Sequence, residues 1–212
     1  QVCPRTAGWA RHDCRQDFYC TQREYEKARQ CPMDFAELIR QRQSVREYSD
    51  RPVERDKLNA LVEAVRLAPS ASNSQPWKVI FVDEPQLRDR VARATFSKAL
   101  SFNSFALQAP VIAVLTQERP KVITQIGGRI KDKEYPLIDI GVAAAHFCLQ
   151  ATELGLGTCM IGWFQEQRIK DLLHIPRGTG VGLLITLGYS EAPLRDKIRK
   201  PALGMSCFNR YE

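Results

Sequence analysis

The residues best suited to chemistry begin with a short segment that sets two arginines around a serine. Arg42, Ser44 and Arg46 follow a stretch of helical periodicity, and Gln43 lies between the first two. Guanidinium groups and a hydroxyl are donors that suit a phosphate monoester, because they form charge-assisted and bidentate hydrogen bonds. The segment therefore predicts an anion site. The alternative is a pair of solvent-facing arginines at a helix end.

A second segment, residues 68–77, reads Ala-Pro-Ser-Ala-Ser-Asn-Ser-Gln-Pro-Trp. Its two prolines restrict the backbone on either side of a run of small, hydroxyl and amide residues. A stiff loop of this kind can present polar groups to the edge of a heterocyclic ring. An ordinary connection between a helix and a strand is the alternative.

Other catalytic motifs are absent from the sequence. The glycines of residues 155–162 follow a predicted helix instead of a strand and are misplaced for a dinucleotide-binding fingerprint. The chain has 3 histidines and lacks the motifs of serine hydrolases and zinc proteases. Nucleophilic or metal catalysis by histidine therefore has little to work with, and we expect no metal site. If the protein is an enzyme, a cofactor must carry the chemistry.

Cysteines mark off the first 32 residues. Four of the seven, Cys3, Cys14, Cys20 and Cys31, precede Met33, and their spacing fits neither zinc nor iron–sulfur motifs. A metal site, a disulfide-linked extension and an irregular or non-native segment all remain open. Ordered periodicity begins after Met33, so we predict an extension of unknown role over 1–32 and one domain over 33–212.

Composition sets the class of protein. The chain has 212 residues, of which 44% are hydrophobic and 26% charged, as in ordinary globular domains. No apolar run approaches the roughly 18 residues of a membrane span, so we expect no membrane partner, and no basic-then-apolar leader opens the sequence. Cys148, Cys159 and Cys207 lie among apolar neighbours, which indicates buried thiols of a reduced cytoplasmic protein. The net charge of +7 is spread without blocks or basic–aromatic repeats, which argues against nucleic acid and favours a solvated surface that suits an anionic ligand.

Periodicity predicts the elements that position these segments. Helical spacing is found after residue 33 and over 52–68, 85–93, 137–154 and 166–173, and strand-like apolar runs cover 78–82, 111–115, 158–161 and 181–187. Residues 195–211 have no period and suggest an extended arm. Fully apolar strands mixed with helices indicate an α+β or α/β fold with a covered sheet.

The long helix over 137–154 is apolar almost all round, which predicts burial on nearly every side. Its polar residues form one narrow stripe: Asp139, His146, Gln150 and Glu153. Small residues form a seam opposite: Gly141, Ala144, Ala145, Cys148 and Ala151. Such a seam allows another helix to approach closely, and we expect that helix to belong to a second subunit.

Taken together, these motifs resemble the nitroreductase family of flavoproteins. Three carry the likeness: residues 42–46 (Arg-Gln-Ser-Val-Arg), residues 68–77, and the helix end Glu153-Leu-Gly-Leu-Gly157. Leu187-Gly-Tyr189 and Arg199-Lys-Pro201 also fit, so the resemblance runs from Met33 to Tyr211 in the family's order. Gln43 departs from the pattern, which often has arginine there.

The resemblance implies an α+β nitroreductase-like fold, with a central, mostly antiparallel sheet flanked by helices, in an intertwined homodimer that binds FMN at the subunit interface. The phosphate and ribityl chain would be held by Arg42, Gln43, Ser44, Arg46, Lys197 and Arg199. The partner subunit's 69–75 segment would line the flavin ring with Pro69, Ser70, Ala71, Asn73 and Gln75. The backbone at Ile161 and Gly162 would lie near flavin N5, and Asn103 is a further candidate for a ring contact.

The function implied is an oxidoreductase that passes a hydride from NADH or NADPH through flavin N5 to a small electron-poor acceptor, such as a nitroaromatic or a quinone. No side chain need act as an acid or base. A specialised flavin enzyme of the same fold, such as a reductive dehalogenase or a dehydrogenase, is one alternative, although no insertion here is long enough for an extra lid. A non-enzymatic basic binding protein is the other.

Overall fold

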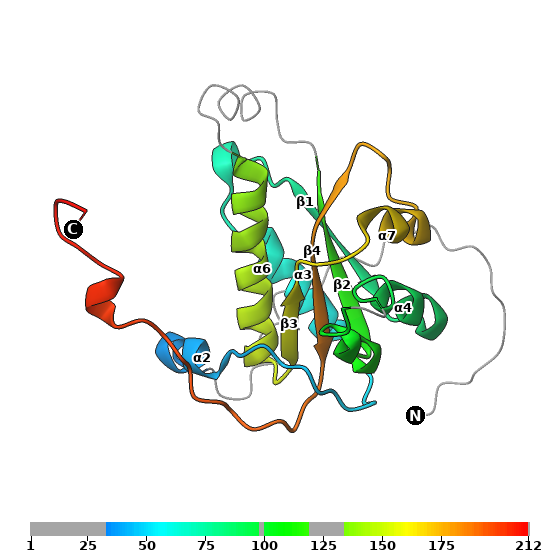
Figure 1. Cartoon of the computed structure of the whole chain (residues 1–212), viewed down its shortest axis with the longest axis horizontal. Helices are drawn as coiled ribbons and strands as arrows, with labels where there is room; N and C mark the ends of the chain where they lie inside the picture. The colour runs from blue at the N-terminus through cyan, green and yellow to red at the C-terminus, as the bar shows by residue number, and fades with distance from the viewer. Residues whose placement is uncertain (1–32, 98–99, 119–133, 212) are drawn as a thin grey trace, which may run out of the picture.

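A computed structural model describes residues 33–97, 100–118 and 134–211. The N-terminal extension and its four cysteines lie outside these residues. Within them, four strands form a single antiparallel sheet with the order β1-β2-β4-β3. The strands are β1 (Trp77–Val82), β2 (Val111–Gln117), β3 (Gly157–Ile161) and β4 (Gly180–Gly188). The α+β class and the antiparallel sheet predicted from the sequence are confirmed (Figure 1).

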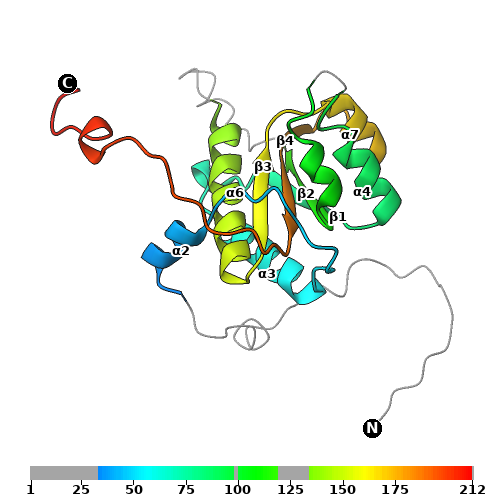
Figure 2. The same cartoon turned by 60° about the horizontal axis from the view of Figure 1, so that its bottom comes forward.

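Helices cover both faces of this sheet. Figure 2 shows α3 (Arg55–Arg66) and α6 (Tyr135–Glu153) on one side, and α4 (Pro85–Ala92) and α7 (Glu166–Leu173) on the other. Each layer encloses its own apolar cluster, one around Phe147 of α6 and one around Ile169 of α7. Strand β2, between the two clusters, is buried from Val111 to Thr116, which explains its continuous apolar sequence.

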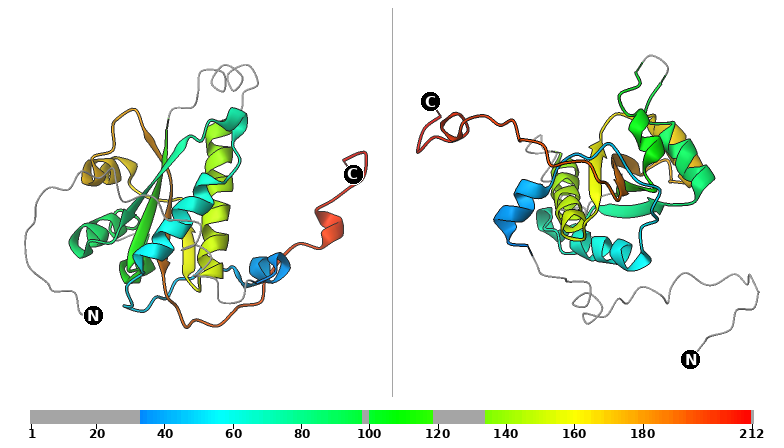
Figure 3. Two further views of the ribbon diagram at one scale, coloured as in Figure 1. Left: turned by 180° about the vertical axis from the view of Figure 1, so that it is seen from behind. Right: turned by 90° about the horizontal axis from the view of Figure 1, so that it is seen from below.

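Short elements complete the described chain. Helix α2 (Phe35–Gln41) packs beside α6 (Figure 3), and single turns of 3₁₀ helix occur at η1 (Ala71–Asn73), η2 (Ser104–Gln108) and η3 (Ala202–Gly204). Local sequence accounts for the helix starts. Asp34 caps α2 by accepting from the Glu37 backbone N–H at 2.8 Å, and Glu84 caps α4. Every helix and strand predicted from periodicity within the described residues is present.

The predicted burial of α6 is wrong in part. Ala144, Cys148 and Ala151 are buried in the chain's own core, against α3 and the sheet. Gly141 and Ala145, by contrast, are exposed, together with Ile138 at 57%. The small-residue seam is therefore two surfaces, because residues 144 and 145 point about 100° apart around a helix.

The chain ends in an exposed arm. Beyond β4 it runs past α2 and away from the body (Figure 1), with Leu203 and Phe208 at least 90% exposed. This agrees with the extended arm expected over 195–211. None of the helices within the described ranges is long and apolar enough to cross a membrane, and those ranges contain no cluster of three or more potential metal ligands.

Candidate functional site

The 42–46 segment runs along the free edge of the sheet, beside β3. The Val45 backbone N–H donates to the Thr158 carbonyl at 2.8 Å, and Ser44 forms a parallel bridge with Thr158. Gly157 permits this approach, since a Cβ at that position would lie 2.8 Å from a methyl group of Val45. Backbone contacts thus fix the segment on β3. The side chains of Arg42, Ser44 and Arg46 remain available to line a pocket.

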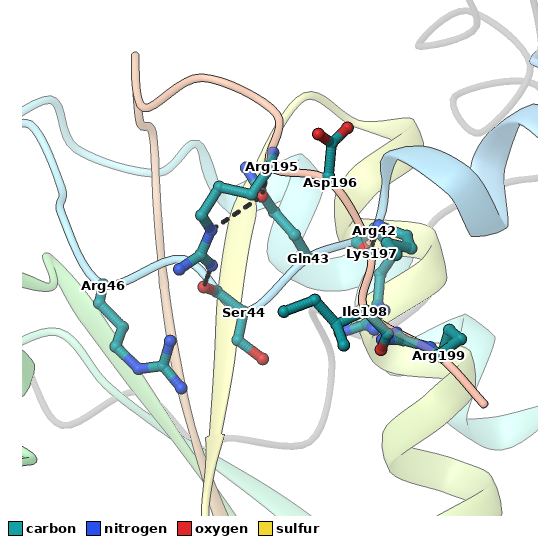
Figure 4. A pocket seen from close by; sticks show the side chains of 9 residues that line it. All are labelled: Arg42, Gln43, Ser44, Arg46, Arg195, Asp196, Lys197, Ile198 and Arg199. Carbon is teal, nitrogen blue, oxygen red and sulfur yellow. Dashed lines mark hydrogen bonds between the residues drawn. The ribbon is translucent and has the colours of Figure 1, made fainter.

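The base of the C-terminal arm forms the opposite wall. The Gln43 side chain links the two walls: its Nε2 donates to the Pro193 carbonyl at 3.1 Å, and its Oε1 accepts from Arg195 N at 3.1 Å and Arg195 Nε at 3.3 Å. Arg195 Nη2 also donates to the Ser44 carbonyl, and Lys197 Nζ donates to the Arg42 carbonyl at 2.9 Å. We call this set of contacts the arm latch (Figure 4).

Between the two walls lies an open pocket of about 360 Å³. Figure 4 shows its side chains, which belong to Arg42, Gln43, Ser44, Arg46, Arg195, Asp196, Lys197, Ile198 and Arg199. Five of these nine residues are cationic and one is acidic. Desolvation lowers the pKa of Lys197, as does repulsion from Arg42, Arg199 and Arg195. Cations held this close together favour an anion among them, because an anion would relieve their mutual repulsion.

Arg46 lies on the other side of Ser44 from Arg42, Lys197 and Arg199 (Figure 4). Its guanidinium carbon is 5.8 Å from the centroid of the buried Phe105 ring. Close to Ser44 and Arg46, Cys159 of β3 is 4% exposed, and burial raises its pKa despite the neighbouring Arg46. Cys159 does not line the pocket, which leaves the ligand contacts to the charged and polar side chains around it.

The 70–75 loop, which contains η1, has a strained backbone. Ser72, Asn73 and Gln75 have φ values of 52°, 49° and 46°, a left-handed conformation that costs residues other than glycine about 1–2 kcal/mol each. Ser70 Oγ accepts from Gln75 N at 2.9 Å, and Asp139 Oδ1 of α6 accepts from Ala71 N at 3.0 Å. Strain maintained by such contacts is typical of functional loops.

The strained loop and the cationic pocket do not meet within one chain. The loop lies beside the first turns of α6, whereas the pocket lies near the other end of that helix (Figure 1). None of residues 69–75 lines the pocket.

A third predicted region follows β3. Ile161 is buried and Gly162 is exposed, and the next residue, Trp163, packs edge-to-face on Phe102 with ring centroids 5.8 Å apart. The buried Asn103 amide donates to the Thr95 carbonyl at 3.0 Å and to the Trp163 carbonyl at 3.4 Å. Asn103 therefore uses its amide nitrogen to fix the backbone at the end of β3.

Four residues of these sites were not predicted from the sequence: Arg195, Asp196 and Ile198 in the pocket, and Asp139 at the loop. Arg195 lines the pocket beside the predicted Lys197 and Arg199. Alternation could have revealed it, because in an extended chain residues 195, 197 and 199 lie on one side. The sequence predicts Asp139 only as one member of a polar stripe, because its contact with the loop depends on the fold.

Comparisons with known proteins agree with this architecture. The model of the nitroreductase family matches residues 39–189. An Archaeoglobus fulgidus protein, provisionally named an NADH dehydrogenase/NAD(P)H nitroreductase, is 32% identical over 162 residues, which cover 73% of this chain and 84% of that protein. The crystal structure of a Clostridium novyi nitroreductase family protein is similar with a TM-score of 0.68 and 33% identity, covering 77% of this chain and 89% of that one. An FMN-dependent nitroreductase from Clostridium difficile has a TM-score of 0.67 and 25% identity, covering 82% and 98% of the two chains.

Proposed function

Because this chain belongs to the nitroreductase family, we propose that it is an FMN-dependent oxidoreductase that uses NADH or NADPH to reduce small electron-poor acceptors such as nitroaromatics and quinones. The single observation that carries the proposal is the pocket with five cations between the 42–46 segment and the arm. Relatives named NAD(P)H nitroreductase and FMN reductase, and a solved FMN-dependent nitroreductase, support the same reaction class.

The residues present fit the phosphate of FMN. A phosphate monoester carries up to two negative charges, and the pocket offers guanidinium and ammonium donors with a serine hydroxyl at its centre (Figure 4). Arg42 and Arg46 would bind the phosphate from opposite sides of Ser44, and Lys197 and Arg199 would close over it from the arm. The Lys197 ammonium, whose pKa is lowered partly by repulsion from three arginines, would gain a counter-charge.

FMN, when bound, supplies the hydride-transfer chemistry between NAD(P)H and the acceptor. The chain's contribution is geometry and a positive field. The rigid backbone at the end of β3, fixed by Asn103, would define one border of the ring site near Ile161 and Gly162. The 70–75 loop, with Pro69 before it, would supply amide and hydroxyl groups along the ring from the partner subunit.

We infer a homodimer because the two parts of this site lie apart in one chain. Ile138, Gly141 and Ala145 follow one another along one side of α6, and all three are exposed. A second copy covering this face would bury apolar surface, which is the main favourable term in association, and would bring a 70–75 loop toward the neighbouring pocket. We also place the protein in the cytoplasm, since Cys148, Cys159 and Cys207 are free thiols, although Cys207 is exposed and not buried as predicted.

The decisive experiment is the colour and flavin content of the purified protein. We expect a yellow protein that releases FMN on denaturation and oxidises NADH or NADPH when a quinone or nitroaromatic is added. Arg42→Ala should weaken FMN binding by about 1.5–3 kcal/mol, the value of a hydrogen bond to a charged group, or roughly 10–150-fold. Arg177→Ala, which removes an exposed charge outside the pocket, is the matched control.

A colourless protein that cannot be reconstituted with FMN would refute the enzyme and favour the basic binding protein. Equal FMN affinity in Arg42→Ala and Arg177→Ala would refute the phosphate assignment alone. A specialised flavin enzyme would instead bind FMN and be reduced by NAD(P)H, yet turn over neither quinone nor nitroaromatic.

A further inference from the structure

Asp139 is an ionisable residue in an otherwise apolar part of α6, and it is 4% exposed. One carboxylate oxygen, Oδ1, accepts from the Ala71 backbone N–H at 3.0 Å. The other, Oδ2, is buried without a hydrogen-bond partner among the described residues. A buried carboxylate with so few partners is costly, and an apolar residue is often as stable in its place. Packing alone therefore does not account for Asp139.

The contact of Asp139 with Ala71 ties the strained loop to another element. Inside the loop, the 3₁₀ turn and the Ser70 hydroxyl hold residues 70–75 to one another. These internal bonds fix the shape of the loop but not its position on the sheet layer. Asp139 adds that connection, from the second turn of a long helix whose other face is packed in the core.

We propose that Asp139 is a positioning residue for the flavin site: its carboxylate holds the Ala71 amide and so fixes where the 70–75 loop presents its polar groups to the flavin ring. The proposal rests on the proposed function for its consequence in catalysis. The hydrogen bond from the Ala71 N–H to Asp139, which we call the tether, lies within one chain and can be measured without flavin.

The tether is tested by amide hydrogen exchange of Ala71 in the flavin-free protein. We expect exchange about tenfold faster in Asp139→Ala than in wild type, the effect of losing one hydrogen bond. Asp139→Asn keeps an acceptor oxygen and should stay near the wild-type rate. Thr152→Val, which removes a hydroxyl bond to the Cys148 carbonyl in the last turns of the same helix, should leave Ala71 unchanged.

The second measurement removes the donor instead of the acceptor. Ala71→Pro deletes the N–H, and the extended Ser70 before it, at φ −146° and ψ 155°, has the conformation that a residue preceding proline prefers. If both variants break one tether, Ala71→Pro, Asp139→Ala and the double variant should weaken FMN binding to the same extent and shift the visible absorption band of the flavin alike.

Several results would overturn the proposal. Equal Ala71 exchange in Asp139→Ala and wild type would remove the tether. If the losses of FMN affinity in the two single variants multiply in the double variant, Asp139 acts through something other than Ala71. The same conclusion follows if Asp139→Asn binds FMN as weakly as Asp139→Ala. A tether that is present in a protein unable to bind FMN would refute the proposed function but not the contact.

Discussion

Replacing Gln43 should reveal how far the C-terminal arm controls the cationic pocket. The Gln43 amide forms three hydrogen bonds with the arm, at 3.1, 3.1 and 3.3 Å. Each is worth about 0.5–1.5 kcal/mol in general, and partial exposure places these at the lower end. We therefore expect Gln43→Ala to weaken the association of the arm with the 42–46 segment by about 1–2 kcal/mol. This converts to FMN binding weaker by roughly 5–30-fold.

The assay is titration of the apoprotein with FMN, followed by quenching of flavin fluorescence. Gln41→Ala is the matched control, because the Gln41 amide donates to Glu37 within α2 at 2.9 Å and is not part of the pocket lining. Proteolysis of the arm provides a second readout that needs no flavin, and cleavage beyond residue 190 should be faster in Gln43→Ala. If Gln43→Ala and Gln41→Ala bind FMN equally and are cleaved equally, the arm latch does not position the pocket.

Three further outcomes follow from the described contacts. Tyr189→Phe removes a hydroxyl that donates to Glu54 at 2.6 Å. Burial and, after it, the bond to Glu54 raise the pKa of Tyr189 to about 12. Because that bond above all holds the pKa of Glu54 at about 2, below its usual 4.5, its stabilisation is complete above pH 4.5 and lost toward pH 2. Thermal unfolding should therefore separate wild type from Tyr189→Phe by about 2–4 °C at pH 7, roughly 1 kcal/mol in a chain of this size. The separation should be smaller near pH 2, where only the bond from Lys57 to the same hydroxyl remains, and a pH-independent separation would contradict the ion-linked contact. Ala145→Leu should weaken dimerisation in light scattering, whereas Ala144→Leu, inside the core, should lower the unfolding midpoint by overpacking at about 1–3 kcal/mol; a dimer unaffected by Ala145→Leu would exclude this face of α6 from the interface. Deleting residues 1–32 should leave FMN binding and turnover unchanged, since the family match begins at residue 39, and loss of flavin would restore the metal or disulfide hypotheses for that segment.

Local pattern was sufficient for the elements of this protein. The spacing of Leu58, Leu61 and Val65 predicted the buried face of α3, and those three residues are buried. The continuous apolar run in β2 predicted a strand covered on both faces, as observed. Such features can be read because helix and strand periods are properties of a few adjacent residues. The sequence also predicted an anion site from its cationic residues. The structure places all four of them around one pocket: Arg42, Arg46, Lys197 and Arg199.

Tertiary structure decided which groups meet. Ala144 and Ala145 are adjacent residues of the same type, and only the position of the sheet makes Ala144 buried and Ala145 exposed. Arg195 is held at the pocket by a hydrogen bond to Gln43, 152 positions earlier in the chain. Asp139 accepts a hydrogen bond from Ala71, 68 positions away. Periodicity identifies a face of an element but not its neighbour, because the neighbour is selected by packing and hydrogen bonding between segments far apart in sequence. For that reason the sequence by itself determined the elements and the charges of this protein, while the arm latch, the contact of Asp139 with Ala71 and the separation of the 70–75 loop from the cationic pocket came from the fold.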